Sequence, residues 1–90
     1  MDILSSVDHN KAFYLTNGTH VHDLMQLADE VHHMDQSTFA SHVNGQKHDF
    51  ANWVNEVFEQ PDLAKKLSSA TTPHNVEIIL LRAIIKALRH

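Results

Sequence analysis

The fold of this 90-residue chain is decided by residues 42–58, which read His42-Val43-Asn44-Gly45-Gln46-Lys47-His48-Asp49-Phe50-Ala51-Asn52-Trp53-Val54-Asn55-Glu56-Val57-Phe58. The stretch holds the only Trp, two of the four Phe and one of the two Gly. In its second half, apolar side chains recur at i, i+3, i+4, i+7 and i+8, which makes one wide helical face. We expect the end of one helix, a Gly turn, and a second helix beginning near residue 48 or 49 with its aromatic face in the core.

On the N-terminal side of this stretch, Asp35 is a good N-cap for a short helix with Phe39 and Val43 inward. Asn44-Gly45 predicts a left-handed C-terminal cap for that helix. Further upstream, residues 23–34 follow the i, i+3, i+4, i+7 pattern of an amphipathic helix. Its inward side chains are Leu24, Leu27, Ala28 and Val31.

The first part of the chain contains a strong hairpin signal. Asn17-Gly18 lies between apolar residues, and this pair favours a two-residue type I′ turn because both positions need a positive φ. We expect a β-hairpin over residues 12–21. Residues 1–10 are polar and unpatterned and are expected to form a flexible arm. Residues 11–90 then form a single helical domain.

Downstream, Pro61 suits the first turn of a short helix that ends near Ser68. Thr72-Pro73 is a cap followed by a proline at the first helical position, and it opens the last helix. The predicted fold is mainly α, with four to five short helices and a small N-terminal β-hairpin.

The last helix carries two apolar stripes, whereas a surface helix needs only one. The first stripe has spacing 3, 4, 3 and consists of Ile78, Leu81, Ile85 and Leu88. The second consists of Val76, Leu80, Ala83, Ile84 and Ala87. One interpretation is that the first stripe binds a second copy of the chain or another protein. The other is that the helix threads the middle of the monomer. Two heptads are too short to predict a coiled coil.

Composition excludes several classes. With no Cys, disulfides and thiolate sites are absent. No window approaches 18 apolar residues, and the N-terminus lacks the basic and apolar regions of a signal peptide, so we expect no membrane segment and a cytoplasmic address. Residues 1–60 carry two basic and nine acidic side chains, a charge that repels a phosphate backbone, and we expect no nucleic-acid partner.

Nine histidines in 90 residues are unusual. Neutral imidazole is a common ligand for zinc and nickel. A metal site would draw on His20, His22, His32 and His33, with Asp23 or Asp29 as a carboxylate ligand. No His-Glu-x-x-His motif supports this hypothesis, and exposed polar histidines are the simpler interpretation.

His42 differs from the other histidines because it lies beside the inward face and close to the Gly turn. Asp49 can reach it after the chain reverses, and Trp53 follows one turn later. Such a pair can act in acid–base catalysis, but a structural junction of His42, Asp49 and Trp53 is the favoured interpretation. No nucleophile motif such as Gly-x-Ser-x-Gly occurs. We therefore expect no enzymatic activity.

Several segments carry a resemblance: Phe13-x-Leu15-x-Asn17-Gly18 with a hydrophobic entry at Leu24, Phe39-x-x-His42-Val43-Asn44, Asp49-Phe50-x-x-Trp53-Val54 and Leu63-Ala64. Together they resemble a small uncharacterised domain of archaeal and bacterial proteins, for which no activity carries over. The resemblance implies Asn before Asp49-Phe50, where this chain has His48. Asn is the better N-cap, so this departure puts the capping role of residue 48 in question.

These patterns predict a non-enzymatic protein–protein interaction or regulatory module that self-associates through its C-terminal helix. The alternative is a histidine-rich domain that binds metal or senses pH.

Overall fold

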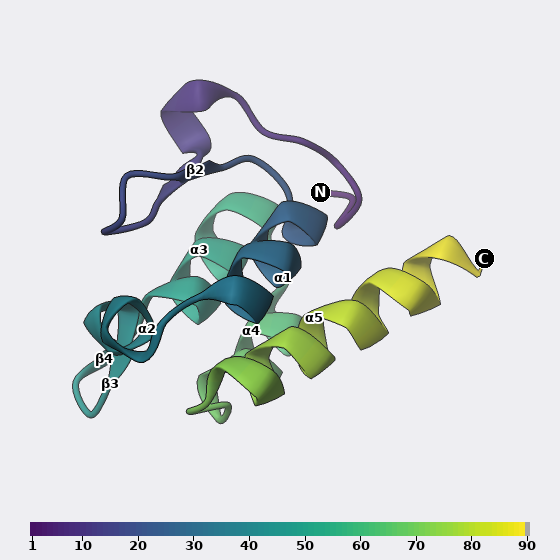
Figure 1. The fold of residues 1–90 in the computed structure, drawn as a ribbon. Coiled ribbons are helices and arrows are strands. Elements are labelled where there is room, and N and C mark those ends of the chain that lie inside the picture. The colour runs from purple at the N-terminus through teal and green to yellow at the C-terminus, as the bar shows by residue number, and fades with distance from the viewer. Residues whose placement is uncertain (90) are drawn as a thin grey trace.

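The computed structural model describes residues 1–89, which form five α-helices and two small antiparallel hairpins (Figure 1). The mainly α fold with an N-terminal hairpin is therefore confirmed. In chain order the elements are the 3-10 helix η1 (His9–Lys11), β1 (Phe13–Tyr14), β2 (His20–Val21), α1 (Leu24–His33), α2 (Gln36–His42), β3 (Val43–Asn44), β4 (Lys47–His48), α3 (Asp49–Phe58), α4 (Pro61–Ser68) and α5 (Pro73–Leu88).

The helices begin where capping side chains place them. Asp35 accepts a hydrogen bond from the Thr38 amide at 2.8 Å, and Thr72 accepts one from the Asn75 amide at 3.2 Å. Both satisfy amides that have no partner inside a helix. The starts predicted for α2 and α5 are confirmed.

The first hairpin is confirmed, but its predicted two-residue type I′ turn is wrong. Phe13 pairs with Val21, and the Leu15 amide donates to the Thr19 carbonyl at 2.9 Å, which leaves a three-residue loop. Within this loop only Gly18 has a positive φ, at 95°, and its amide donates to the Leu15 carbonyl. This is the loop in which a turn is followed by a left-handed Gly, so Asn17 keeps a negative φ.

The left-handed cap predicted at Asn44-Gly45 is also wrong. Val43 ends α2 in extended conformation, and Gly45 does not have a positive φ. Instead β3 and β4 pair as a second hairpin, with Val43 opposite His48 and Asn44 opposite Lys47. The chain therefore reverses through strand pairing, which brings the end of α2 next to the start of α3.

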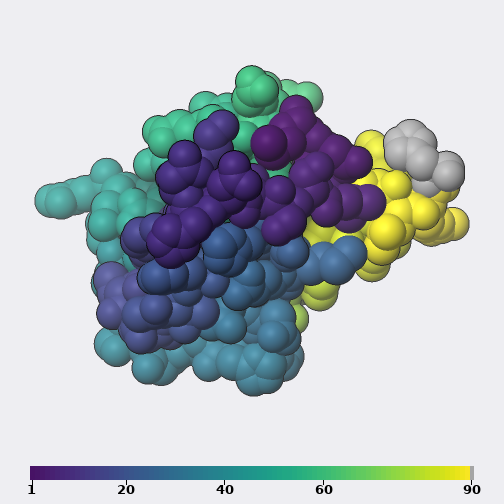
Figure 2. All heavy atoms as spheres, turned by 90° about the horizontal axis from the view of Figure 1, so that it is seen from above, coloured from purple at the N-terminus to yellow at the C-terminus, as the bar shows by residue number. Residues whose placement is uncertain are grey.

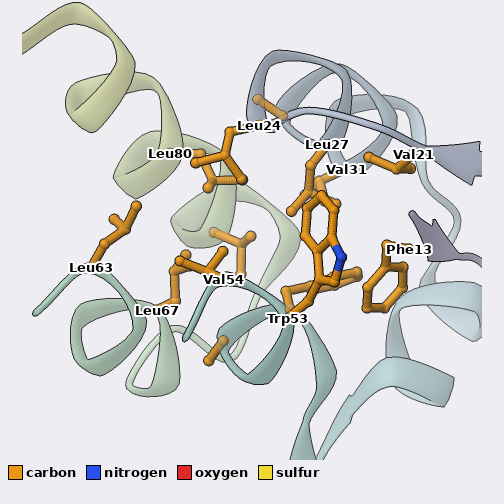
Figure 3. Packing of buried hydrophobic residues seen from close by; sticks show 14 of the residues in the cluster. Phe13, Val21, Leu24, Leu27, Val31, Trp53, Val54, Leu63, Leu67 and Leu80 are labelled. Atoms are coloured by element: carbon orange, nitrogen blue, oxygen red, sulfur yellow. The ribbon is translucent and has the colours of Figure 1, made fainter. Parts of the chain in front are cut away.

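The core lies between two helix pairs, α1 with α5 and α3 with α4, and the first hairpin closes one end. Figure 3 shows the Trp53 indole beside Phe13, and the two ring centroids lie 5.7 Å apart in an edge-on arrangement. Phe50, Val54 and Phe58 of α3 are fully buried, as the helical face predicts. Val57 lies at the edge of the core and is only partly buried.

The N-terminal segment makes definite contacts with the body. Val7 is buried, and its amide donates to the His22 carbonyl at 2.8 Å. Ile3 and Leu4 pack partly against the core, and Figure 2 shows the first residues lying close to α5. The boundary expected at residue 10 therefore does not coincide with the edge of the core. Within residues 1–89, no helix is both long enough and apolar enough to cross a bilayer.

Candidate functional site

The two stripes of α5 have different environments. Val76, Leu80 and Ile84 of the second stripe are buried in the core. The four side chains of the first stripe remain between 39 and 60% exposed; they are Ile78, Leu81, Ile85 and Leu88. The monomer covers only one face of α5, so the interpretation of a helix buried on both sides is wrong for the isolated chain.

A surface groove extends the exposed stripe toward α1. It is lined by Met25, Ala28, Asp29, His32, Glu77, Leu81 and Ile84. Met25 is 49% exposed, and it continues the apolar surface of Leu81 across the groove. We call the four stripe residues together with Met25 the α5 face. It is the largest gathering of exposed large apolar side chains among the described residues. Of the other two, Tyr14 lies in β1, and Met1 is held at Gln60, whose side chain donates to its carbonyl.

The α5 face has acidic groups on its α1 side. Glu77 is held there because the Nδ1 atom of His32 lies 2.9 Å from its carboxylate. Only 19% of the Glu77 side chain is exposed, so α1 fixes its position. Asp29 lines the same groove and is 73% exposed.

The opposite edge of the α5 face is basic. Arg82, Lys86 and Arg89 follow the stripe on the side away from α1, as a rotation of about 100° per residue requires. Arg82 and Lys86 border a separate hollow with Asp62 of α4 and Asp2. Among the described residues, none of these three cations takes part in an ion pair. The apolar stripe therefore separates an acidic edge from a basic one.

His42, predicted as part of a structural junction, is 4% exposed. Its Nε2 accepts a hydrogen bond from the Thr16 amide at 3.1 Å, and its Nδ1 donates to the Asp49 carboxylate at 3.0 Å. Lys47 also contacts that carboxylate, at 3.0 Å. Both ring nitrogens are occupied, so His42 joins the first hairpin loop, α2 and α3.

Trp53 belongs to the same junction through its ring rather than through a polar contact with His42. Its indole Nε1 donates to the Lys11 carbonyl at 2.8 Å. Phe13 lies between the two, with its ring centroid 5.0 Å from that of His42 and 5.7 Å from that of Trp53. The three predicted junction residues therefore lie in one packed cluster.

His48 has a capping role that the departure from the resemblance left in question. Its Nδ1 accepts from the Ala51 amide at 3.2 Å, which caps α3, and its Nε2 donates to the Ala70 carbonyl at 2.9 Å. An Asn at this position has a shorter side chain, so the link to the loop after α4 is a property of the imidazole.

The four histidines proposed as metal ligands are not brought together. His20 and His22 precede α1 and His32 and His33 end it, and ten residues at about 1.5 Å each separate the pairs by about 15 Å. No group of three or more His, Cys, Asp or Glu side chains within residues 1–89 is placed to hold a metal ion. His32 instead contacts Glu77, and the Nδ1 of His22 bonds to the Val7 carbonyl at 3.1 Å.

Two residues were not predicted from the sequence: Met25, which belongs to the α5 face, and His9, which packs against the first hairpin. Met25 and Asp29 lie at i and i+4 with His32 at i+7, a spacing that places them on one face of α1. That pattern was available, but nothing in it indicates that α5 lies alongside. The His9 ring centroid lies 5.3 Å from that of His20 and 5.7 Å from that of Tyr14, a contact for which the sequence holds no signal.

Comparison with protein-family models, with curated proteins and with solved structures finds no match for this chain.

Proposed function

We propose that this chain is a non-enzymatic interaction module that associates with itself through the α5 face. The proposal rests on one observation. The core is already packed against the second stripe of α5, and the first stripe stays exposed to solvent; it consists of Ile78, Leu81, Ile85 and Leu88. Scattered apolar residues on a surface need no explanation, but a contiguous set marks an interaction site.

The energy available supports association. Burying an exposed Leu or Ile side chain contributes about 1.5–3 kcal/mol, and a two-fold arrangement counts each stripe residue twice. Association costs about 4–15 kcal/mol in lost translational and rotational freedom. Each stripe side chain is already partly covered, so the gain per residue is at the lower end, and a dimer of modest affinity is expected.

The geometry of the polar residues supports a role other than catalysis. A general acid or base needs a nitrogen or oxygen within reach of the substrate. His42 is buried and has both ring nitrogens engaged, by Thr16 and by Asp49. The pair is therefore used to hold three segments together.

The test is sedimentation equilibrium of tag-free protein over a range of concentrations, comparing wild type with Leu81→Asp. We expect a reversible wild-type dimer and a monomeric variant with an unchanged far-UV circular dichroism spectrum. Lys86→Asp is the matched control, because it changes charge at an exposed position of the same helix outside the stripe. A wild-type monomer at high micromolar concentration would overturn the proposal.

The alternative is transition-metal binding. The His9 ring lies near those of His20 and His22, but these three side chains are not placed to hold an ion as the chain is folded, so binding would require the rings to move. Zinc titration of metal-free protein followed by NMR tests it. Shifts confined to those three histidines at low micromolar zinc would support binding there. Sedimentation with and without a chelator separates the two proposals, because only a metal-linked dimer dissociates on chelation.

A further inference from the structure

The exposed stripe of α5 is not only apolar, because its Ile and Leu residues also alternate in a specific order. Written as a heptad, Ile78 and Ile85 fall at the a positions and Leu81 and Leu88 at the d positions. In parallel coiled coils, Ile at a with Leu at d favours two helices over three or four. All four side chains are exposed in the folded chain, so they are available for such packing.

The charged residues beside the stripe occupy the matching flanking positions. In the same heptad, Glu77 is at g, while Arg82 and Arg89 are at e. In a parallel pair, a g residue faces the e residue five positions later on the other helix, so Glu77 faces Arg82 of the second copy. In an antiparallel pair, like edges meet, and Arg82 then lies against the basic edge of its mate.

The surroundings of Glu77 strengthen the parallel arrangement. His32 fixes the carboxylate at the border of the stripe, and Asp29 adds a second negative charge in the same groove. An Arg82 side chain arriving from a parallel partner meets this acidic groove and not the basic edge. Opposite charges across an interface set orientation more than they add affinity.

We propose that the partner of α5 is a second copy of this chain, with the two α5 helices parallel and in register and Glu77 of each copy facing Arg82 of the other. This inference rests on the proposed self-association. Two heptads do not hold an isolated coiled coil together, but α5 is already folded on its own core through Val76, Leu80 and Ile84. The conformational entropy of α5 is therefore lost on folding of the monomer and does not oppose association.

Single cysteines test the orientation cleanly, because the natural chain has none. In the proposed parallel dimer, mild oxidation of the Leu88→Cys variant joins the two subunits by a disulfide between the cysteines at position 88. The Ile78→Cys variant likewise forms a disulfide between the cysteines at position 78. In an antiparallel dimer the two thiols of the Leu88→Cys variant lie about 15 Å apart, since ten residues at about 1.5 Å each separate the ends of the stripe. In that case only a mixture of the two variants would crosslink, through a disulfide between position 78 of one subunit and position 88 of the other, which we call the crossed product.

The crossed product would overturn the parallel arrangement and leave the dimer standing. Absence of any dimer by sedimentation would overturn both proposals. Lys86→Cys, at an exposed position outside the stripe, is the control for collisional crosslinking.

A charge exchange tests the flanking pair separately. Glu77→Arg and Arg82→Glu should each raise the dimer dissociation constant about three- to tenfold at low salt, and the double variant should recover most of that loss. Lys86→Glu is the control, at an exposed position that is neither e nor g. Independent losses in the double variant, with no recovery, would exclude the Glu77–Arg82 contact.

Discussion

Two histidines in this chain link separate segments, because in each ring one nitrogen accepts a hydrogen bond and the other donates one. In His42, Nε2 accepts from the Thr16 amide and Nδ1 donates to Asp49. In His48 the roles are reversed, since Nδ1 accepts from the Ala51 amide and Nε2 donates to the Ala70 carbonyl. Each arrangement requires a neutral ring with one particular tautomer.

We expect His42 to carry its proton on Nδ1 and His48 to carry its proton on Nε2. Long-range proton–nitrogen NMR spectra at neutral pH, which distinguish the protonated from the bare ring nitrogen, measure this directly. His74, which is exposed at the start of α5, is the control and should show a mixture of tautomers. The opposite tautomer in either ring would contradict the hydrogen bonds described above.

Asp35 makes a second prediction about a single residue. The hydrogen bond from the Thr38 amide, with those from the Thr38 and Ser37 side chains, lowers the pKa of Asp35 from its ordinary 3.8. A lowered pKa in the folded state means that the unfolded chain takes up the proton first. The contribution of Asp35 is therefore complete above about pH 4 and is lost as the pH falls through the folded-state pKa.

Asp35→Asn keeps an oxygen at the cap but removes the charge. Urea midpoints measured between about pH 5 and pH 2 should fall more steeply for wild type than for this variant. Parallel curves would show that Asp35 makes no such contribution.

At the scale of elements, the two glycines have opposite requirements. Gly18 closes the first hairpin with a φ of 95°, which an L side chain adopts at a cost of about 1–3 kcal/mol. Gly45 has no positive φ and has open space where a Cβ would lie. Replacing such a glycine by alanine restricts mainly the unfolded chain.

Gly18→Ala should therefore lower the free energy of unfolding by about 1–3 kcal/mol. Gly45→Ala should leave it unchanged or raise it by up to about 1 kcal/mol. Urea denaturation followed by Trp53 fluorescence measures both variants against wild type. Equal losses in the two would contradict the hairpin geometry described for these turns.

At the scale of the whole molecule, the two stripes of α5 separate folding from association. Leu80 is fully buried, whereas Ile85 is 50% exposed on the same helix. Leu80→Ala should lower the unfolding free energy of the monomer by about 2–5 kcal/mol. Ile85→Ala should change it by no more than about 0.5 kcal/mol and should weaken dimerisation.

Urea denaturation at low protein concentration and sedimentation at high concentration measure these two effects independently. Because a dimer stabilises the folded state by mass action, the wild-type melting temperature should also rise with protein concentration. A strong loss of monomer stability in Ile85→Ala would mean that the stripe belongs to the core.

Much of the architecture follows from local patterns. The helical faces of α1 and α3, the caps at Asp35 and Thr72, and the proline starts of α4 and α5 are set by residues within one or two turns of each other. Trp53 joins its cluster through Phe13, which is distant in sequence, but the His42–Asp49 pair was also predictable, since the chain reverses between these two residues. Such a contact between residues close in the sequence can be predicted without knowing how the rest of the chain folds.

Other features depend on residues far apart in the chain. The periodicity of α5 contains two apolar stripes and gives no preference between them; the packing of α1 and α4 against Val76, Leu80 and Ile84 buries one and leaves the other to solvent. The turn at Asn17-Gly18 is another case, because several loops fit the same pair and strand register selects among them. The position of Glu77 beside His32 likewise depends on packing between helices 45 positions apart in the chain. Side-chain order along the chain specifies what each segment can bury, and only packing between distant segments specifies what stays exposed.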